Sequence, residues 1–284
     1  MRTIVITGGT DGMGAALARH YLAAGDRVTV IGRSRTKFDT LVAEAVAASG
    51  DAGRDHSSGD HTVNARAEFI AADLSLVAES RRVVELLKAR YRRVDALILA
   101  ASFVRRHRLT TAEGHEATWA LFFLGKYVLV TGLAPLLRAS DRPVIVNTAV
   151  PGAPADAVDF ADPELTRGFT ARRANARQRR ANELLGLLAT ADNSRLAYAT
   201  WGPARLVGTG FAGDIGPGLR LTATVLGRLL GQRPEVAVRP VVRLVDDPVP
   251  GRSAHRGAAE RPLTVGADDA GDAARLAAVV VRDL

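Results

Sequence analysis

Short apolar runs alternate with longer amphipathic segments along this chain. The first two runs, RTIVITG at 2–8 and DRVTVIG at 26–32, are rich in β-branched residues and end in glycine, which is typical of strands. Between them, MGAALARHYLAAG spaces its apolar residues at helical intervals and stops at a glycine. The pattern predicts a strand–helix–strand unit, followed by a second helix over 36–48.

The same alternation continues to the middle of the chain. Strands that alternate with helices of this length form a parallel sheet covered on both faces. The predicted fold class is therefore α/β, a single doubly wound Rossmann domain over residues 1–284 with no internal repeat. The four further strands are expected in EFIAADLS (68–75), VDALILAAS (94–102), RPVIVNTAV (142–150) and SRLAYATWG (194–202).

A polar stretch over 49–67 interrupts this pattern. Its low hydrophobicity predicts a flexible loop. It contains potential metal ligands, but such loops collect these residue types without a metal, so no metal site is predicted. The residues in question are Asp55, His56, Asp60 and His61.

Composition narrows the class of protein. The chain has 284 residues, 47% of them hydrophobic, and no cysteine, which excludes disulfides, thiolate nucleophiles and cysteine-ligated zinc. No uninterrupted apolar run is long enough to span a membrane, and the chain begins directly with a strand, so we expect a cytoplasmic protein without a membrane partner.

The net charge of +8 raises the question of nucleic-acid binding. Only three of the 38 basic residues are lysines, and the arginines are spread through the chain among alanine, glycine and valine. This distribution favours a solvated basic surface, so no nucleic-acid partner is expected.

The segment TGGTDGMG at 7–14 carries the clearest chemistry. Its glycines Gly8, Gly12 and Gly14 lie where a strand turns into a helix, so the backbone can approach a pyrophosphate and offer N–H groups to it. The second strand ends in IGRS without an acidic residue, and Arg33 can meet a 2′-phosphate, which favours NADP(H) over NAD(H). Asp11, within the turn, carries a negative charge that is unfavourable beside a phosphate.

These motifs resemble the short-chain dehydrogenases/reductases over nearly the whole chain, and residues 109–137 are similar to the branch that contains retinol dehydrogenases. The resemblance implies that Asp73 and Leu74 lie against the adenine and that the end of the fourth strand supports the cofactor. That end reads Ala100-Ala101-Ser102 in place of the family's Asn-Ala-Gly. The cofactor-binding set implied is Thr7, Gly8, Asp11, Gly12, Met13, Gly14, Arg33, Asp73, Leu74, Ala100, Ala101 and Arg179.

The resemblance also implies four catalytic residues, and this chain differs at each of them. The family uses a serine after the fifth strand, a tyrosine and a lysine four residues apart on the next helix, and an asparagine on the preceding helix. The tyrosine donates a proton and the lysine lowers its pKa. The corresponding positions here are Val150, Asn175, Arg179 and Phe122, and none of the chain's tyrosines falls after the fifth strand and before the sixth.

Other residues are candidates to replace this chemistry. Thr148 lies two residues before Val150, on the same face of the strand, and its hydroxyl can either contact a substrate or bond to backbone. Arg179 keeps a fixed charge that can hold ribose hydroxyls, whereas Asn175 cannot act as an acid. Lys126 follows Phe122 by one helical turn and is interpreted as an exposed lysine.

The segment around the predicted cleft is rich in charge. Basic residues at its expected mouth, interpreted as solvated, suggest an anionic or polyoxygenated small-molecule substrate, while an acidic loop after the fifth strand is interpreted as solvated too. Residues 209–233 correspond to the family's substrate lid, and the helix that carries Asn175 often packs on a partner subunit in this family, so a homo-oligomer is an expectation. The charged residues are 105–108, Arg172, Arg173, Arg177 and Arg180 for the basic group and Asp156, Asp159, Asp162 and Glu164 for the acidic loop.

Three functions fit a retained cofactor site without the family's acid. We favour a biosynthetic enzyme that keeps NADP(H), as a structural element, and catalyses a non-redox cyclisation, dehydration or isomerisation by positioning and electrostatics. The alternatives are an NADPH-dependent ketone or aldehyde reductase with a substitute proton donor, and a non-catalytic partner or ligand sensor.

Overall fold

One sheet organises the described part of the chain. The computed structural model describes residues 1–49, 62–103, 106–205, 207 and 231–283. Eight strands form the sheet in the order β3-β2-β1-β4-β5-β6-β7-β8, parallel except for the antiparallel β7–β8 pair. The strands are β1 (Thr3–Thr7), β2 (Arg27–Gly32), β3 (Ala67–Ala71), β4 (Ala96–Leu99), β5 (Val144–Asn147), β6 (Ala197–Gly202), β7 (Gly251–Arg256) and β8 (Ala259–Arg261).

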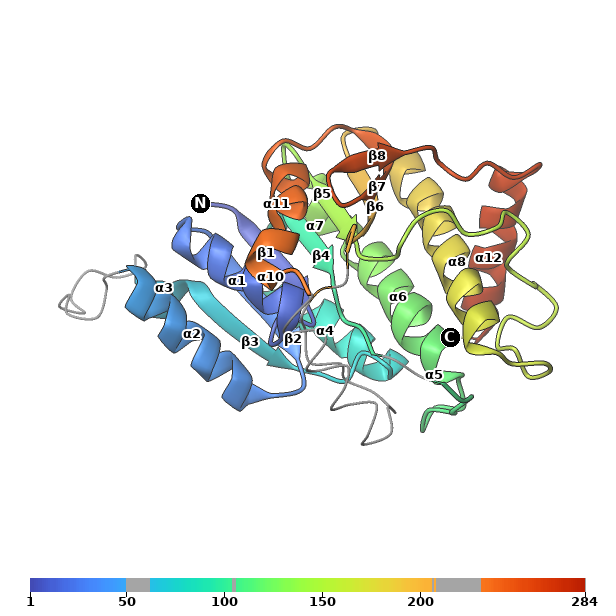
Figure 1. Ribbon diagram of the computed structural model, residues 1–284, viewed down its shortest axis with the longest axis horizontal. Helices are drawn as coiled ribbons and strands as arrows, with labels where there is room; N and C mark the ends of the chain where they lie inside the picture. The colour runs from blue at the N-terminus through green and yellow to red at the C-terminus, as the bar shows by residue number, and fades with distance from the viewer. Residues whose placement is uncertain (50–61, 104–105, 206, 208–230, 284) are drawn as a thin grey trace.

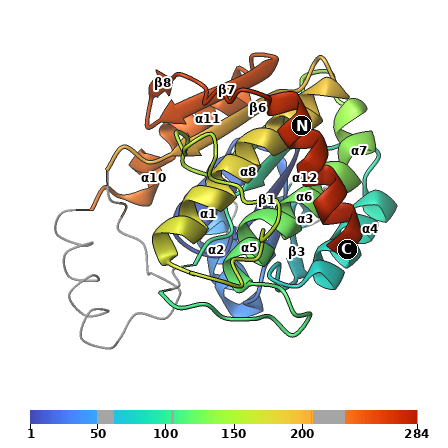
Figure 2. The same ribbon diagram turned by 90° about the vertical axis from the view of Figure 1, so that its right-hand side faces the viewer.

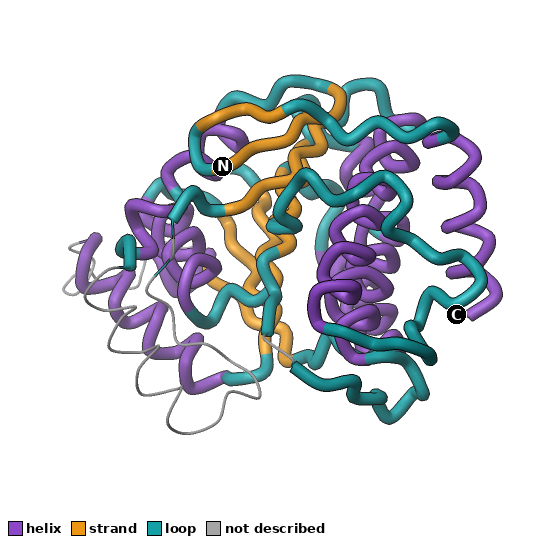
Figure 3. The backbone as a smooth tube through the Cα atoms, turned by 45° about the vertical axis from the view of Figure 1, so that its right-hand side comes forward, coloured by secondary structure: helices purple, strands orange, loops and turns teal. Residues whose placement is uncertain are grey.

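Helices cover both faces of this sheet, as Figure 1 and Figure 3 show. The single doubly wound α/β fold predicted from the sequence is therefore confirmed. The helices are α1 (Gly12–Ala23), α2 (Arg35–Ser49), α3 (Val63–Arg66), α4 (Val77–Arg90), α5 (Ala117–Trp119), η2 (Ala120–Leu124), α6 (Gly125–Gly132), α7 (Ala134–Arg138), α8 (Ala171–Ala191), α10 (Pro234–Ala237), α11 (Arg239–Asp246) and α12 (Asp269–Asp283).

Successive residues of each central strand face opposite layers, because side chains alternate across a pleated strand. In β4, for example, Leu97 and Leu99 join the cluster with α4, α6, α8 and α12. Ala96 and Ile98 join the other cluster, with α1, α2 and α11. Both faces are buried, which is why the central strands read as continuous apolar runs instead of alternating ones.

The strand order changes direction between β1 and β4, which lead to opposite edges of the sheet. In open α/β sheets, ligands bind at such a switch point, outside the carboxyl ends of the strands. The fold thus places the turn after β1 beside the ends of β2, β3 and β4, where the site is expected. None of the described helices is long and apolar enough to cross a membrane.

Two regions differ from the sequence expectation. The end of the predicted polar loop forms the short helix α3 and the first residue of β3, and residues 50–61, with Asp55, His56, Asp60 and His61, lie outside the described residues. Of the predicted lid over 209–233, residues 209–230 also lie outside them. The last third of the chain adds β7, β8 and the C-terminal helix α12, which lies on the outer side of α8 (Figure 2) and which the sequence pattern did not predict.

Candidate functional site

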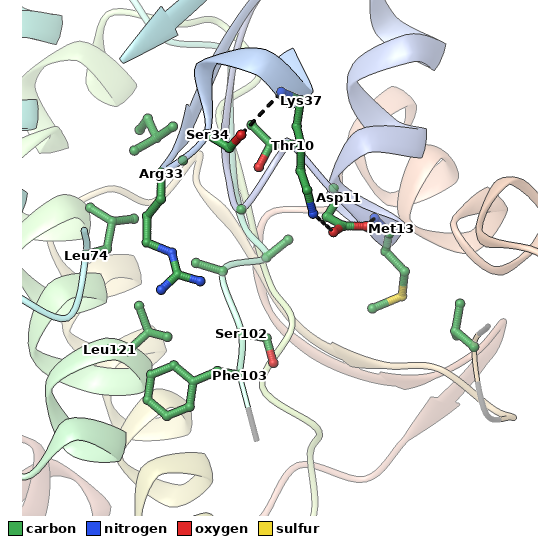
Figure 4. A pocket seen from close by; sticks show the side chains of 18 of the residues that line it. Thr10, Asp11, Met13, Arg33, Ser34, Lys37, Leu74, Ser102, Phe103 and Leu121 are labelled. Carbon is green, nitrogen blue, oxygen red and sulfur yellow. Dashed lines mark hydrogen bonds and ion pairs between the residues drawn. The ribbon is translucent and has the colours of Figure 1, made fainter. Parts of the chain in front are cut away.

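A cleft of about 740 Å³ opens at the switch point of the sheet (Figure 4). Its walls come from the turn after β1, from the ends of β2, β3 and β4, from residues after β5 and β6, and from the last residue of β7. It contains all but two of the cofactor-binding residues predicted from the sequence. The predicted residues that line it are Gly8, Asp11, Gly12, Met13, Gly14, Arg33, Asp73, Leu74, Ala100 and Ala101.

The turn after β1 needs its glycines for two different reasons. Gly8 and Gly12 have φ of 66° and 51°, in the left-handed region that disfavours other residues. At Gly14, a Cβ would lie 2.3 Å from the Gly8 carbonyl oxygen, so only glycine allows α1 to begin this close to the strand. The tight turn leaves the N-terminus of α1 facing the cleft, which is the geometry that binds a phosphate.

Arg33 follows β2 directly and its side chain points into the cleft, on the side of Leu74 and Leu121 (Figure 4). Asp11, which the sequence suggested would repel a phosphate, is paired with Lys37 and accepts a hydrogen bond from the Gly12 N–H at 2.8 Å. Its charge is therefore largely compensated from within the protein. The same ion pair engages Lys37, so Arg33 is the cation of this wall that remains available to a ligand.

Asp73 and Thr7 support the cleft from the sheet. The Asp73 carboxylate accepts hydrogen bonds from the Ser75 N–H at 3.0 Å and the Ser75 hydroxyl at 2.7 Å, which fixes the loop that carries Leu74. Thr7 is buried and does not line the cleft. Its hydroxyl accepts a hydrogen bond from the Ala101 N–H at 3.1 Å and thereby joins the end of β4 to the glycine turn.

The other end of the cleft is formed by residues after β5 and β6 and by the last residue of β7. Val150 lines it at the position that the family resemblance assigns to a serine. Arg179 on α8 does not line the cleft, because its Nε and one Nη donate to the backbone carbonyls of Val150 and Pro151 at 2.5 Å each. Arg179 thus holds the loop after β5 onto α8.

The remaining predicted catalytic residues are also engaged by the protein. The Thr148 hydroxyl donates to the Leu99 carbonyl at 3.0 Å, so its proton is committed to backbone. Asn175 is exposed near the start of α8 and accepts a hydrogen bond from the Gln178 side chain at 3.3 Å. Neither residue lines the cleft.

Lys126 is not the exposed lysine that the sequence suggested. It is 3% exposed, and its Nζ donates to the Asn147 side-chain oxygen at 2.7 Å. Asn147 in turn donates to Asn182 on α8 at 2.6 Å and to the Tyr198 hydroxyl on β6 at 2.9 Å. Burial lowers the pKa of Lys126 to about 7. The residue belongs to a polar network inside the core, between α6, β5, α8 and β6.

The solvated interpretation is also wrong for two of the arginines on α8. Arg177 and Arg180 are 1% and 0% exposed, and they do not border the cleft. Arg177 donates to Glu116 at 2.7 Å and lies over the Trp119 ring at 4.7 Å, while Arg180 pairs with Asp269 on α12. These two side chains join α8 to α5 and α12, because helix spacing turns them towards those helices and away from the cleft.

Two carboxylates of the acidic loop, Glu164 and Asp162, have structural roles. Glu164 accepts hydrogen bonds from the His115 ring at 3.0 Å and from the Glu116 N–H. Asp162 accepts from the Thr166 N–H at 2.8 Å and the Arg167 N–H at 3.1 Å, and these bonds lower its pKa against the opposing effect of burial. This part of the loop is held by hydrogen bonds within it and by those to the segment that precedes α5.

Several cleft residues were not predicted from the sequence. Phe103, whose ring packs edge-on against Phe122 at 5.3 Å, follows a β4 end that lacks the family's pattern. Arg256 comes from β7, a strand with a single buried residue and therefore no apolar run to signal it. The unpredicted residues that line the cleft include Ser102, Phe103, Leu121, Arg205, Val207 and Arg256.

The strand order and the helices on both faces define an α/β protein of the Rossmann type, with its cleft at the switch point of the sheet. The family model for short chain dehydrogenase matches residues 2–156, more than half of the chain, and the chain belongs to this family. An archaeal alcohol dehydrogenase from Thermococcus sibiricus, whose structure was determined in complex with 5-hydroxy-NADP, has the same fold, with a TM-score of 0.63 and 17% sequence identity over 93% of this chain and 100% of that chain.

Two curated relatives share part of the sequence. The oxidoreductase calI of Penicillium decumbens is 30% identical over 192 residues, which is 65% of this chain and 51% of the relative. The human polyprenol dehydrogenase is 27% identical over 142 residues, 50% of this chain and 39% of the relative. The chain thus spans about half or less of the length of these relatives.

Proposed function

We propose that the cleft binds NADP(H). The observation that carries this proposal is the glycine turn with Arg33 beside it: the turn leaves room for a pyrophosphate at the N-terminus of α1, and the end of β2 offers a guanidinium where NAD-binding proteins offer a carboxylate. Asp73 and Leu74 would border the adenine. These residues would hold the cofactor, and NADPH held in this way would be able to supply a hydride.

For the reaction, we propose a non-redox conversion of a small molecule at the Val150 end of the cleft. The described residues that line this end are Val150, Pro203, Ala204, Arg205, Val207 and Arg256, which include no acid or base that titrates near neutral pH. Fixed positive charge and an apolar wall can orient a substrate and stabilise developing negative charge. A cyclisation, dehydration or isomerisation fits these groups, and NADP(H) would then serve as a structural element.

A second candidate is an NADPH-dependent reductase of ketones or aldehydes. It is favoured by the names of the relatives, a dehydrogenase and an oxidoreductase, and by the Ser102 hydroxyl in the cleft wall. Steady NADPH oxidation with a panel of ketones, lost in Ser102→Ala, would favour this candidate over the first. A non-catalytic ligand sensor is the third candidate, and a protein that binds NADPH yet converts no compound in either assay would favour it.

The cofactor proposal is tested by titrating the full chain with NADPH and with NADH, following energy transfer from Trp119 and Trp201 to the nicotinamide. We expect saturable binding with NADPH preferred. Arg33→Ala should weaken NADPH binding roughly tenfold to hundredfold and NADH binding much less, because a charge-assisted hydrogen bond to a phosphate contributes about 1.5–3 kcal/mol.

Arg35→Ala is the matched control, since Arg35 is exposed, pairs with Asp39 and does not line the cleft. Equal affinity of the two cofactors for the wild-type protein would contradict the role of Arg33. No binding of either would overturn the cofactor proposal.

A further inference from the structure

Positive charge is concentrated at the end of the cleft that is remote from Arg33. Arg205, after β6, and Arg256, at the end of β7, both line this end and are exposed there. Within the described part of the chain, neither guanidinium has a carboxylate partner. The carboxylates that line the cleft, Asp11 and Asp73, belong to the glycine-turn end and are engaged by Lys37 and Ser75.

A third arginine, Arg179, adds to the positive charge near this end of the cleft. Burial, together with the nearby charge of Arg256, lowers the pKa of Arg179, and Glu183 opposes this effect. The Glu183 carboxylate is itself engaged, by the Gly152 N–H at 2.9 Å and by Arg180 at 3.4 Å. Two cations that repel each other beside a cleft are stabilised when an anion binds between or beside them.

The position of Arg256 is fixed by the backbone around it. Gly257, the first residue of a two-residue hairpin turn between β7 and β8, has φ of 60°, which such turns require and glycine supplies. Its N–H donates to the Gly202 carbonyl at 2.7 Å, and its own carbonyl accepts from the Trp201 ring nitrogen at 2.9 Å. These bonds hold the turn against the end of β6, and they thereby fix the backbone of the neighbouring Arg256.

We propose that Arg256, assisted by Arg205, binds the carboxylate or phosphate of an anionic substrate at this end of the cleft. Val150, Phe103 and Leu121 line the same cleft and offer apolar surface to the body of such a molecule. The ligand class is thus a small organic acid or phosphate ester with one anionic group and an apolar part. The inference deepens the proposed function, on which it rests for the role of the cleft.

The test uses the full chain saturated with NADP⁺ and three probes of similar shape: phenylacetate, phenyl phosphate and the neutral phenylacetamide. Isothermal titration should show at least one of the two acids binding about tenfold or more tightly than the amide, because a guanidinium recognises carboxylate and phosphate through paired hydrogen bonds. The two acids distinguish a carboxylate site from a phosphate site. Equal binding of all three probes, or binding of none, with the cofactor in place overturns the proposal.

Arg256→Gln should abolish the preference for the acid, and Arg256→Lys should keep part of it, since the charge remains and the fork is lost. Arg252→Gln, on the same strand and outside the cleft, is the matched control and should bind the probes as the wild-type protein does. If Arg256→Gln instead weakens NADPH binding by the same factor, Arg256 serves a cofactor phosphate, and the substrate assignment is overturned.

The two proposals fail in different ways. A protein that does not bind NADPH, but whose cofactor-free form prefers the acids through Arg256, overturns the cofactor proposal and supports this inference. If the protein prefers NADPH through Arg33 but binds the acids and the amide equally, the cofactor proposal is supported and this inference is overturned.

Discussion

The side chains whose roles were predicted wrongly are mainly charged residues that were expected to be solvated and are buried. Lys126, Arg177 and Arg180 occupy sequence positions typical of solvated helix residues, yet each is at least 97% buried, since their exposed fractions are 3%, 1% and 0%. Helical spacing specifies which residues share a face but not which neighbouring helix covers that face. Arg33 was predictable because its place after β2 is defined by the strand–turn–helix unit itself.

Lys126 provides a test at the residue scale. Burial lowers its pKa to about 7 in the folded protein, whereas the unfolded chain has the ordinary value near 10.4. Between these values the unfolded chain binds more protons, so the contribution of Lys126 to the free energy of unfolding falls as the pH decreases from about 10 to about 7, and it is constant below. The neighbouring Tyr198 stays neutral throughout, because burial raises its pKa.

Lys126→Met removes this dependence. We expect the free energy of unfolding of the variant, relative to the wild-type protein, to rise by several kcal/mol between about pH 10 and pH 7, measured by urea denaturation. Lys88→Met is the control, because Lys88 is half-exposed and pairs only with Glu85. A difference between variant and wild type that does not change with pH would show that Lys126 is not held neutral in the core.

At the scale of elements, the sequence predicted the position of α8 correctly but not the contacts that its arginines make. Its position after β5 was predicted, and its first half carries Asn175 and Arg179 where the resemblance places the family's tyrosine and lysine. The structure adds that α8 is joined to α5 through Arg177 and Glu116 and to α12 through Arg180 and Asp269. These partners come from distant segments, so local sequence patterns could not indicate them.

The Arg177–Glu116 pair should contribute strongly to stability, because both side chains are fully enclosed. Arg177→Met leaves Glu116 buried with its charge and should lower the free energy of unfolding by about 3–5 kcal/mol. Arg172→Met, at an exposed position of the same helix, should change it by less than about 0.5 kcal/mol. Chemical denaturation at neutral pH measures both, and a similar small effect of the two substitutions would contradict the structural role of Arg177.

The strands that the sequence predicted are those with an apolar run. β1, β2, β4, β5 and β6 are buried over most of their length, and β3, with a single buried residue, was still found from its apolar residues. At the other edge of the sheet, β7 also has a single buried residue and β8 has none, and neither GRSAHR nor AER contains an apolar run. The same edge contributes Arg256 to the cleft. The sequence thus did not predict Arg256 as a cleft residue, because the strands at this edge contain too few apolar residues to be recognised as strands.

At the scale of the whole molecule, the C-terminal helix bears on assembly. In the family that the chain resembles, this helix often packs on a partner subunit. Here α12 packs beside α8 (Figure 2), and Ala273, Leu276 and Val280 of α12 are part of the main core. We therefore propose that the chain does not associate through α8. Light scattering coupled to size-exclusion chromatography should give a mass near 30.0 kDa, that of one chain.

A matched pair of substitutions, one at a buried and one at an exposed position of α12, tests how much the packing of this helix contributes to stability and to the monomeric state. Leu276→Asp places a charge at a position that is 0% exposed and should lower the free energy of unfolding by several kcal/mol, because the carboxylate loses its water. Loss of the α12 cover would also expose the apolar surface of α8, so we expect this variant to form larger species in the same light-scattering experiment. Val281→Asp, at a position that is 70% exposed, should remain stable and monomeric. A wild-type mass of about twice 30.0 kDa that persists in Val281→Asp would contradict the expectation of a single chain, since the exposed face of α12 would then not be what joins the two copies.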